Sequence, residues 1–271
     1  MADGAGGFRL WKYYLDCVSA DGDVCIAYVA GLRWGPLAVR YAALLESGAD
    51  GARRERHTYA RVPEPVVSAQ GIEWRCEPLG VAATWRDAMP AHRATLLDGA
   101  SGRISWELLA PRATARIERP AGAAVAGWGY AERLELTIEP WRLPFDTLYW
   151  GRFHSATDAL VWIGWEGDVR LRHIVHNGEL LREASFEERT LRFEPGRELH
   201  LDDTRMLHDA PVIAAVDRLP RVLRRVPPSF MAAREVKWLS QARLLAGNRA
   251  PVHGWALHET VTVRPRVASG R

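Results

Sequence analysis

A ten-residue motif that occurs twice constrains this chain more than any other feature of its sequence. Residues 127–136 read GWGYAERLEL, and residues 254–263 read GWALHETVTV. Both copies begin with Gly-Trp, place a glutamate four residues after the tryptophan, and continue with apolar residues at alternate positions. A weaker pair of similar segments, 11–29 and 150–165, opens each half in the same order. An ordered repeat of this kind predicts two similar structural units in one chain.

The boundary between the two units is predicted near residue 140. The first motif is followed by Pro140-Trp141-Arg142-Leu143-Pro144, whose two prolines are unsuited to the interior of a sheet. A length of 271 residues also fits two domains of ordinary size. We therefore expect one domain at 1–140 and a second at 141–271.

Most of the chain has the pattern of β-strands. Apolar and aromatic runs such as 8–18, 24–34 and 160–165 are bounded by Gly, Pro and charged turn residues. Asn177-Gly178 suits a type I′ hairpin turn, in which both central residues need positive φ. Only 211–226 reads as helical, and Pro220 interrupts it. Many short strands with one short helix in the C-terminal half predict an all-β fold of barrels or sandwiches.

Composition and charge exclude several classes of partner. The net charge of +3 is small for the length and no polybasic run occurs, so nucleic acid is not an expected partner. No stretch approaches the ~18 apolar residues of a membrane-spanning helix, so no integral membrane segment is expected. The N-terminus lacks an apolar signal region, and a cytoplasmic location is expected. A homodimer stays open, because nothing in the sequence fixes the oligomeric state.

No metal or cofactor is expected from the motifs. The three cysteines, Cys17, Cys25 and Cys76, lack metal-ligand spacing and are expected to be buried thiols. His173 and His176 lie three apart, which on a strand points them to opposite faces, and the acidic and histidine-rich segment 200–209 is typical of a solvated strand end. Phosphate loops, nucleophile elbows and Cys-x-x-Cys pairs do not occur.

Alternation along the strand expected at 128–139 puts one carboxyl among apolar side chains. Successive side chains of a strand point to opposite faces. The expected core face receives Trp128, Tyr130, Glu132, Leu134, Leu136 and Ile138, and the expected solvent face receives Gly129, Ala131, Arg133, Glu135, Thr137 and Glu139. A buried carboxyl is paired, bound to metal or protonated. Because burial favours the protonated form, Glu132 is predicted to be a proton donor inside an aromatic pocket.

The same count in the second half places Glu259 on an apolar stripe with Trp255. Glu259 is therefore a second candidate for a buried acid. On the strand at 148–154, alternation puts Trp150, Arg152 and His154 on one face, and this face is expected to line the pocket. The alternative for each glutamate is a structural ion pair with an inward-pointing arginine, for which Arg152 is an available partner.

At these residues the sequence resembles the carotenoid 1,2-hydratases, also called hydroxyneurosporene synthases, and the wider AttH-like group. The segments that carry the resemblance most strongly are 127–132, 140–144 and 150–153, with support from 238–240 and 254–259. The resemblance implies two lipocalin-like (calycin) β-barrel domains packed together around a ligand cavity, and no redox or nucleotide cofactor. It is loose over the rest of the chain.

The resemblance also assigns roles to residues. The aromatic-x-acid pair of the hydratases, which protonates a C=C bond, matches Tyr130 and Glu132. The His-x-Trp pair of the family finds its tryptophan in Trp106 but no histidine, and glutamate replaces the usual aspartate at Glu132. Trp128 and Trp106 are expected to line the pocket and to stabilise a carbocation by cation–π interactions of roughly 0.5–2 kcal/mol each.

Three functions follow as hypotheses. The first is a cofactor-free hydratase or isomerase that acts on an apolar polyene or terpenoid, with Glu132 as general acid and Tyr130 orienting it. The second is a lipocalin-like cyclase of natural-product biosynthesis, in which Glu132 donates a hydrogen bond. The third is a non-catalytic protein that binds a hydrophobic ligand, with both glutamates in structural roles.

Overall fold

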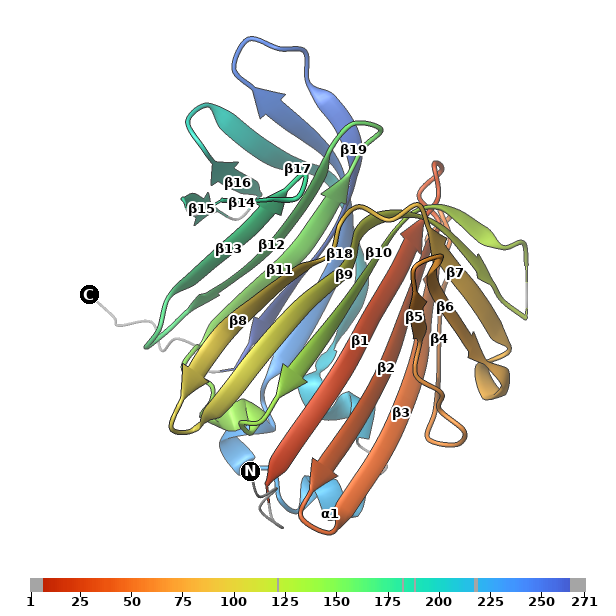
Figure 1. Ribbon diagram of the computed structural model, residues 1–271, viewed down its shortest axis with the longest axis vertical. Helices are drawn as coiled ribbons and strands as arrows, with labels where there is room; N and C mark the ends of the chain where they lie inside the picture. The colour runs from red at the N-terminus through yellow and green to blue at the C-terminus, as the bar shows by residue number, and fades with distance from the viewer. Residues whose placement is uncertain (1–6, 121, 182, 188, 217–218, 264–271) are drawn as a thin grey trace. The chain divides into compact units, whose positions relative to one another are not determined.

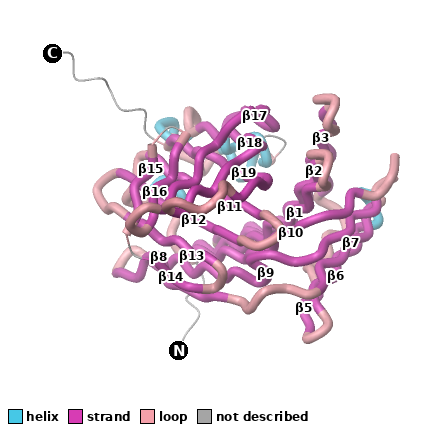
Figure 2. Tube along the Cα trace, turned by 90° about the horizontal axis from the view of Figure 1, so that it is seen from above, coloured by secondary structure: helices cyan, strands magenta, loops and turns pink. Residues whose placement is uncertain are grey.

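The computed structural model describes residues 7–120, 122–181, 183–187, 189–216 and 219–263. These residues form two compact units, divided between Glu139 and Pro140. Strands make up most of each unit, and the helical segments are short (Figure 2). None of the helices in the described part of the chain is long and apolar enough to cross a membrane.

Unit 1 is one antiparallel sheet with a single short 3-10 helix, η1 (Glu77–Leu79). Its strands are β1 (Phe8–Val18), β2 (Val24–Trp34), β3 (Leu37–Ser47), β4 (Arg53–Thr58), β5 (Val66–Ser68), β6 (Gly71–Cys76), β7 (Val81–Arg86), β8 (His92–Gly99), β9 (Gly102–Glu118) and β10 (Val125–Leu136). The order is β4-β3-β2-β1-β10-β9-β7-β6-β5, and β8 pairs with β9. The first and last strands therefore lie side by side, red beside green in Figure 1.

The hairpin of β1 and β2 has the bounds expected from the sequence. Its turn includes Gly22 at φ 86°, a conformation that glycine adopts without strain. Cys17 and Cys25 are direct register partners across this hairpin, and both are buried free thiols, as expected. Burial raises the pKa of the Cys25 thiol, which keeps it protonated and inert.

The core of unit 1 fills the inner face of a strongly curved sheet. One cluster of buried side chains joins Leu44 of β3 to Trp74 of β6, although these strands lie far apart in the sheet order. The edge strand β4 also reaches the far end of the sheet, because Arg56 Nη1 donates to the Leu79 carbonyl oxygen at 2.6 Å. The sheet of unit 1 thus curves into a barrel whose interior is packed with side chains.

Unit 2 has a second antiparallel sheet of nine strands. They are β11 (Thr147–His154), β12 (Ala159–Glu166), β13 (Leu171–His176), β14 (Glu179–Leu181), β15 (Ala184–Phe186), β16 (Thr190–Phe193), β17 (Arg197–Pro211), β18 (Arg234–Ala246) and β19 (Val252–Thr262). The helical segments are η2 (Pro140–Arg142), η3 (Val212–Val216), α1 (Pro220–Leu223) and η4 (Pro228–Phe230). The strand order is β14-β13-β12-β11-β19-β18-β17-β16-β15.

The sheet of unit 2 curves until its two edges nearly meet. The edge strands β14 and β15 are consecutive in the chain, and only three residue steps separate Leu181 from Ala184. Three steps of extended chain span about 11 Å at most. The inner face holds a second core cluster, which includes Phe153 and Phe193. Unit 2 is therefore an almost closed barrel.

The turn at 177–178 has the conformation that the sequence predicts, whereas the segment that begins at 211 differs from the helix that was expected there. Asn177 and Gly178 both have positive φ, 50° and 88°, as a type I′ turn requires. The helix expected over 211–226 is much shorter, because β17 continues to Pro211 and α1 spans only Pro220–Leu223. Pro220 begins the helix rather than interrupting it, since the first helical turn needs no N–H donor.

Candidate functional site

Strand β10 carries the repeated motif through the middle of the unit 1 sheet, between β1 and β9. In register, Glu132 lies opposite Tyr14, and Tyr130 lies opposite Asp16. Directly opposed residues of an antiparallel pair point to the same face. These four side chains therefore share one face of the sheet, which we call the Glu132 face.

The Glu132 face is the outer face of the barrel, not its interior. Ala131, the residue between Tyr130 and Glu132, belongs to the inner core cluster, together with Leu15 and Cys17 of β1. Glu132 is buried, as expected, but it does not point into the barrel interior, and the expectation that Ala131 faces solvent is wrong. At this point both faces of the sheet are buried, so hydrophobicity alone does not distinguish inside from outside.

An irregularity in the pairing of β10 with β9 also alters the expected pattern. The register shifts between Gly129 and Ala131 and again between Ala131 and Glu132. Gly129 is required here, because a Cβ atom would lie 2.3 Å from the Cβ of Ala115. Trp128, expected to line the pocket, is instead 38% exposed, and the Arg112 guanidinium lies 4.8 Å from its ring centroid.

Two aromatic side chains hold the carboxyl of Glu132. The residue is only 7% exposed. Its Oε2 accepts a hydrogen bond from Trp106 Nε1 at 2.5 Å and another from the Tyr130 hydroxyl at 2.6 Å. The structure thus brings together Glu132, Tyr130 and Trp106, three of the residues singled out in the sequence. Their catalytic and binding roles stay predictions.

A row of tyrosines extends the aromatic surroundings of Glu132 across three strands. Tyr130 of β10 packs edge-on against Tyr14 of β1, with ring centroids 6.0 Å apart. Tyr14 packs in the same way against Tyr28 of β2, at 5.3 Å. Lys12 Nζ lies 5.0 Å from the centroid of the Tyr28 ring. This row gives the Glu132 face a series of electron-rich aromatic rings.

Asp16 is a second buried carboxyl on the Glu132 face, and the sequence analysis did not find it. Its exposed fraction is 0%. It lies directly opposite Tyr130 in the register of β1 and β10. The signal was present, because alternation along Phe8–Val18 places Asp16 on the same face as Tyr14. What alternation within one strand cannot give is the register that puts Asp16 beside Tyr130.

The second copy of the motif has a different partner. Glu259, 8% exposed, accepts a hydrogen bond at Oε2 from the ammonium group of Lys237, its direct register partner on β18. Lys237 is itself buried and also donates to Glu235 Oε1 at 2.7 Å. Glu259 is therefore part of an ion pair, as the alternative interpretation expected, but its partner is Lys237 rather than an arginine.

The remaining candidates of unit 2 share the face of Glu259. Trp150 is opposite Glu259, Arg152 is opposite Leu257, and His154 is opposite Trp255. Trp150, Arg152 and His154 are buried, and Arg152 Nη1 donates to the Trp255 carbonyl oxygen at 3.3 Å. The sequence-based grouping of these side chains on one face is thus correct. Their role in binding a ligand stays a prediction.

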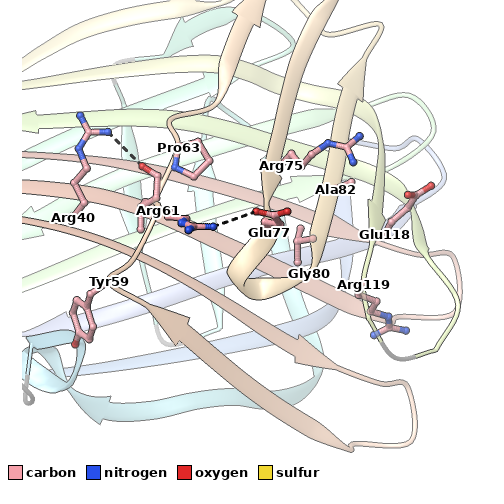
Figure 3. A pocket seen from close by; sticks show the side chains of 12 residues that line it. Arg40, Tyr59, Arg61, Pro63, Arg75, Glu77, Gly80, Ala82, Glu118 and Arg119 are labelled. Carbon is pink, nitrogen blue, oxygen red and sulfur yellow. Dashed lines mark hydrogen bonds and ion pairs between the residues drawn. The ribbon is translucent and has the colours of Figure 1, made fainter.

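A cavity in unit 1 lies away from Glu132. It has a volume of about 990 Å³, and its lining includes Arg40, Tyr59, Arg61, Arg75 and Arg119 (Figure 3). Arg61 pairs with Glu77 at 4.0 Å, also drawn in Figure 3, and Arg119 pairs with Glu46 at 3.4 Å. Glu132 is not among the residues that line this cavity. A smaller cavity of about 340 Å³ includes Trp106 in its lining, and is otherwise mainly polar.

The acidic and histidine-rich segments form ion pairs rather than a metal site. The Asp202 carboxylate accepts from Arg243, and Asp209 accepts from Arg234 at 2.6 Å. These hydrogen bonds hold the pKa of both aspartates below the usual range. Within the described residues, no group of three or more potential ligands is arranged to hold a metal ion.

Comparisons with known proteins find similarity in structure but not in sequence. No family model and no curated protein matches this chain. Solved structures do match over nearly the whole chain. CghA in complex with Sch210972 has a TM-score of 0.57 at 11% identity and covers 96% of this chain and 89% of its own. Kievitone hydratase from Nectria haematococca has a TM-score of 0.52 at 12% identity and covers 97% and 91%.

A third similar structure is a provisionally assigned AttH from Nitrosomonas europaea. Its TM-score is 0.58 at 12% identity, over 96% of this chain and 93% of that chain. At such low identity the similarity establishes the fold. The all-β class with lipocalin-like β-barrel domains, and one short α-helix among the described residues of the C-terminal half, is therefore confirmed.

Proposed function

We propose that this chain is an enzyme that protonates a C=C bond of an apolar polyene or terpenoid, with hydration or isomerisation as the outcome. The observation that carries the proposal is the buried carboxyl of Glu132, held by Trp106 and Tyr130. Protonation of an alkene needs a strong acid kept out of bulk water, and a buried carboxyl meets this need.

The hydrogen bonds of Glu132 suit it to donate a proton from one particular oxygen. Both Trp106 Nε1 and the Tyr130 hydroxyl donate to Oε2. In the protonated carboxyl, Oε2 is then the carbonyl oxygen and Oε1 carries the proton. When that proton leaves, the two donors stabilise the negative charge that develops. Trp106 and Tyr130 therefore fix the orientation of the Glu132 carboxyl.

The tyrosine row supports the second half of the reaction. Protonation of a C=C bond leaves a positive charge on the neighbouring carbon. Aromatic ring faces stabilise such a charge by roughly 0.5–2 kcal/mol each. Tyr130, Tyr14 and Tyr28 place three rings in succession beside the acid. The names of two proteins of the same fold support the proposal further, since one is a hydratase and the other was solved with the small molecule Sch210972.

Farnesol tests the proposal, because it is an isoprenoid with alkenes that yield tertiary cations. In heavy water, each protonation by the enzyme adds deuterium to carbon, which mass spectrometry detects. We expect deuterium in farnesol or its hydrate with the wild-type chain, and a loss of about 10²–10⁴-fold for Glu132→Gln. Glu46→Gln is the matched control, because Glu46 is an equally buried carboxyl of unit 1 held by Arg56 and Arg119.

The same measurement separates the other two hypotheses. If Glu132→Gln retains turnover of farnesol, Glu132 is not the acid and a cyclase that uses only the shape of the site is favoured. Farnesol that quenches tryptophan fluorescence but acquires no deuterium indicates a binding protein and contradicts the proposal. Equal losses for Glu132→Gln and Glu46→Gln would attribute the effect to folding.

A further inference from the structure

We infer that Asp16 is the base of the same reaction, an inference that rests on the proposed function. Asp16 is fully buried, shares the Glu132 face and lies directly opposite Tyr130. Trp85 Nε1 donates to the backbone carbonyl oxygen of Asp16 at 2.8 Å, from the inner face of the sheet. The Asp16 backbone thus anchors the core, and its carboxyl points away from that core.

The register sets the distance between the backbone positions that carry the two carboxyls. Asp16 is opposite Tyr130, and Glu132 is two residues further along β10. Diagonal neighbours of this kind on one face have backbone positions roughly 7–8 Å apart, within the reach of long side chains. Pairs of carboxyls that act as acid and base on opposite sides of a bond, with a water molecule at the base, are about 6.5–9.5 Å apart in inverting glycosidases. The register therefore puts Asp16 and Glu132 at backbone positions from which one carboxyl can act as acid and the other as base.

The hydration step balances with these two groups. The π electrons of the alkene take the proton from Glu132 Oε1 to form a C–H bond, which leaves Glu132 as a carboxylate and the neighbouring carbon as a cation. A lone pair of water forms the C–O bond to that carbon. The proton lost by the water oxygen passes to the Asp16 carboxylate. Alkene and water give an alcohol, and exchange with solvent after product release restores both carboxyls.

The two carboxyls have different surroundings, and in this inference Glu132 is the acid and Asp16 is the base. The Glu132 Oε2 is engaged by Trp106 and Tyr130, which orients its other oxygen. The ionisable groups on this face of β1 and of its neighbours β2 and β10 are Lys12, Tyr14, Tyr28, Tyr130 and Glu132. Lys12 is on the same strand and face as Asp16, four residues before it, and its Nζ lies 5.0 Å from the centroid of the Tyr28 ring.

Asp16→Asn tests this role in the farnesol assay. Without a base, the cation forms but is not captured, so it returns a proton to Glu132. We expect the alcohol product to fall about 10²–10⁴-fold, while deuterium accumulates in the recovered alkene. A merely structural role of Asp16 would lower both products together. The pH profile gives a second readout, because the acidic limb that reflects protonation of Asp16 should disappear in Asp16→Asn.

The outcomes separate this inference from the proposed function. If Glu132→Gln abolishes deuterium incorporation and Asp16→Asn keeps the wild-type ratio of alcohol to deuterated alkene, the role of Asp16 is wrong and the acid stands. If Glu132→Gln has no effect, both fail. Asp16→Glu, which retains a carboxyl, serves if circular dichroism shows that Asp16→Asn does not fold. It is expected to keep part of the alcohol product, and a ratio equal to wild type would contradict the need for a precisely placed base.

Discussion

The two copies of the repeated motif place a glutamate at the same point of two similar barrels and surround it differently. Glu132 and Glu259 are both buried, and both point away from the core of their own unit. Glu132 accepts from an indole N–H and a phenol O–H, whereas Glu259 accepts from the ammonium group of Lys237. The motif thus determines where the carboxyl lies, and the neighbouring strands determine what it can do.

Two neighbouring positions account for the difference. The residue two before the glutamate is Tyr130 in unit 1 and Leu257 in unit 2. The preceding strand supplies Trp106 to Glu132 and Lys237 to Glu259. A lysine beside a carboxyl favours its charged form and fixes an ion pair, which is a structural role. Hydrogen bonds from the two aromatic side chains orient the Glu132 carboxyl without a cation, as the proposed proton transfer needs.

Lys237→Met is expected to have the largest effect on stability. Removal of one partner of a buried ion pair leaves the other charge uncompensated, which lowers the free energy of unfolding by about 3–5 kcal/mol. Denaturant unfolding of the full chain, followed by circular dichroism, measures the loss. The double variant Lys237→Met/Glu259→Leu should recover much of it, because an apolar pair needs no partner. A loss below about 1 kcal/mol for the single variant would contradict a structural role of the pair.

Low pH should destabilise unit 2 through His258, the residue that precedes Glu259. His258 stacks on Trp238 and its Nε2 accepts from Ser240 Oγ at 2.9 Å, whereas the equivalent residue of unit 1 is Ala131. Burial lowers the pKa of His258 from its ordinary value of 6.5 to about 4. The unfolded chain therefore takes up the proton first, so stability present above pH 6.5 is lost as the pH falls to about 4.

Each unit of difference between the pKa of His258 in the unfolded and in the folded chain corresponds to about 1.36 kcal/mol. The expected loss in the free energy of unfolding is therefore about 3 kcal/mol. His258→Gln keeps a side-chain acceptor for Ser240 but does not titrate, so it should remove this part of the dependence of stability on pH. Melting temperatures of both chains between pH 7 and pH 4 provide the measurement. Parallel losses in the two chains would show that His258 is not the group responsible.

Tyr130→Phe should have a moderate effect on the rate. The change removes one of the two donors to Glu132 Oε2 and keeps the ring that packs against Tyr14. Loss of a hydrogen bond to a charged buried acceptor costs about 1–3 kcal/mol. We therefore expect kcat for farnesol to fall about tenfold to a hundredfold, with little change in KM. Tyr41→Phe, on β3 and stacked on His57, is a control that should leave kcat unchanged.

The sequence predicted much of the fold because strand alternation and turn chemistry are local. The hairpin of β1 and β2 and the turn at Asn177-Gly178 follow from a few adjacent residues. The repeat correctly led to two buried glutamates, and the resemblance correctly linked Glu132 with Tyr130 and Trp106. The site could be located to this extent because the motif itself contains its acid.

The rest of the site depends on contacts that no local pattern encodes. Alternation separates the two faces of β10 but does not say which face is the barrel interior, since both are buried at Ala131 and Glu132. Asp16 and Lys237 were missed because their positions beside Tyr130 and Glu259 come from register with distant strands. The register shift at Gly129 and Ala131 lies where β10 packs closely against Ala115 and Trp85, and these contacts could not be read from β10 alone.

The smallest expected effect concerns the tryptophans that open the two motifs. Trp128 is 38% exposed and is contacted by the guanidinium of Arg112, an interaction worth about 0.5–1 kcal/mol at an exposed site. Trp255 is more buried, and its backbone carbonyl accepts from the buried Arg152. Trp128→Ala should therefore lower the free energy of unfolding by about 1 kcal/mol or less, and Trp255→Ala should lower it more. The reverse order would mean that Trp128 contributes more packing to unit 1 than its 38% exposure indicates.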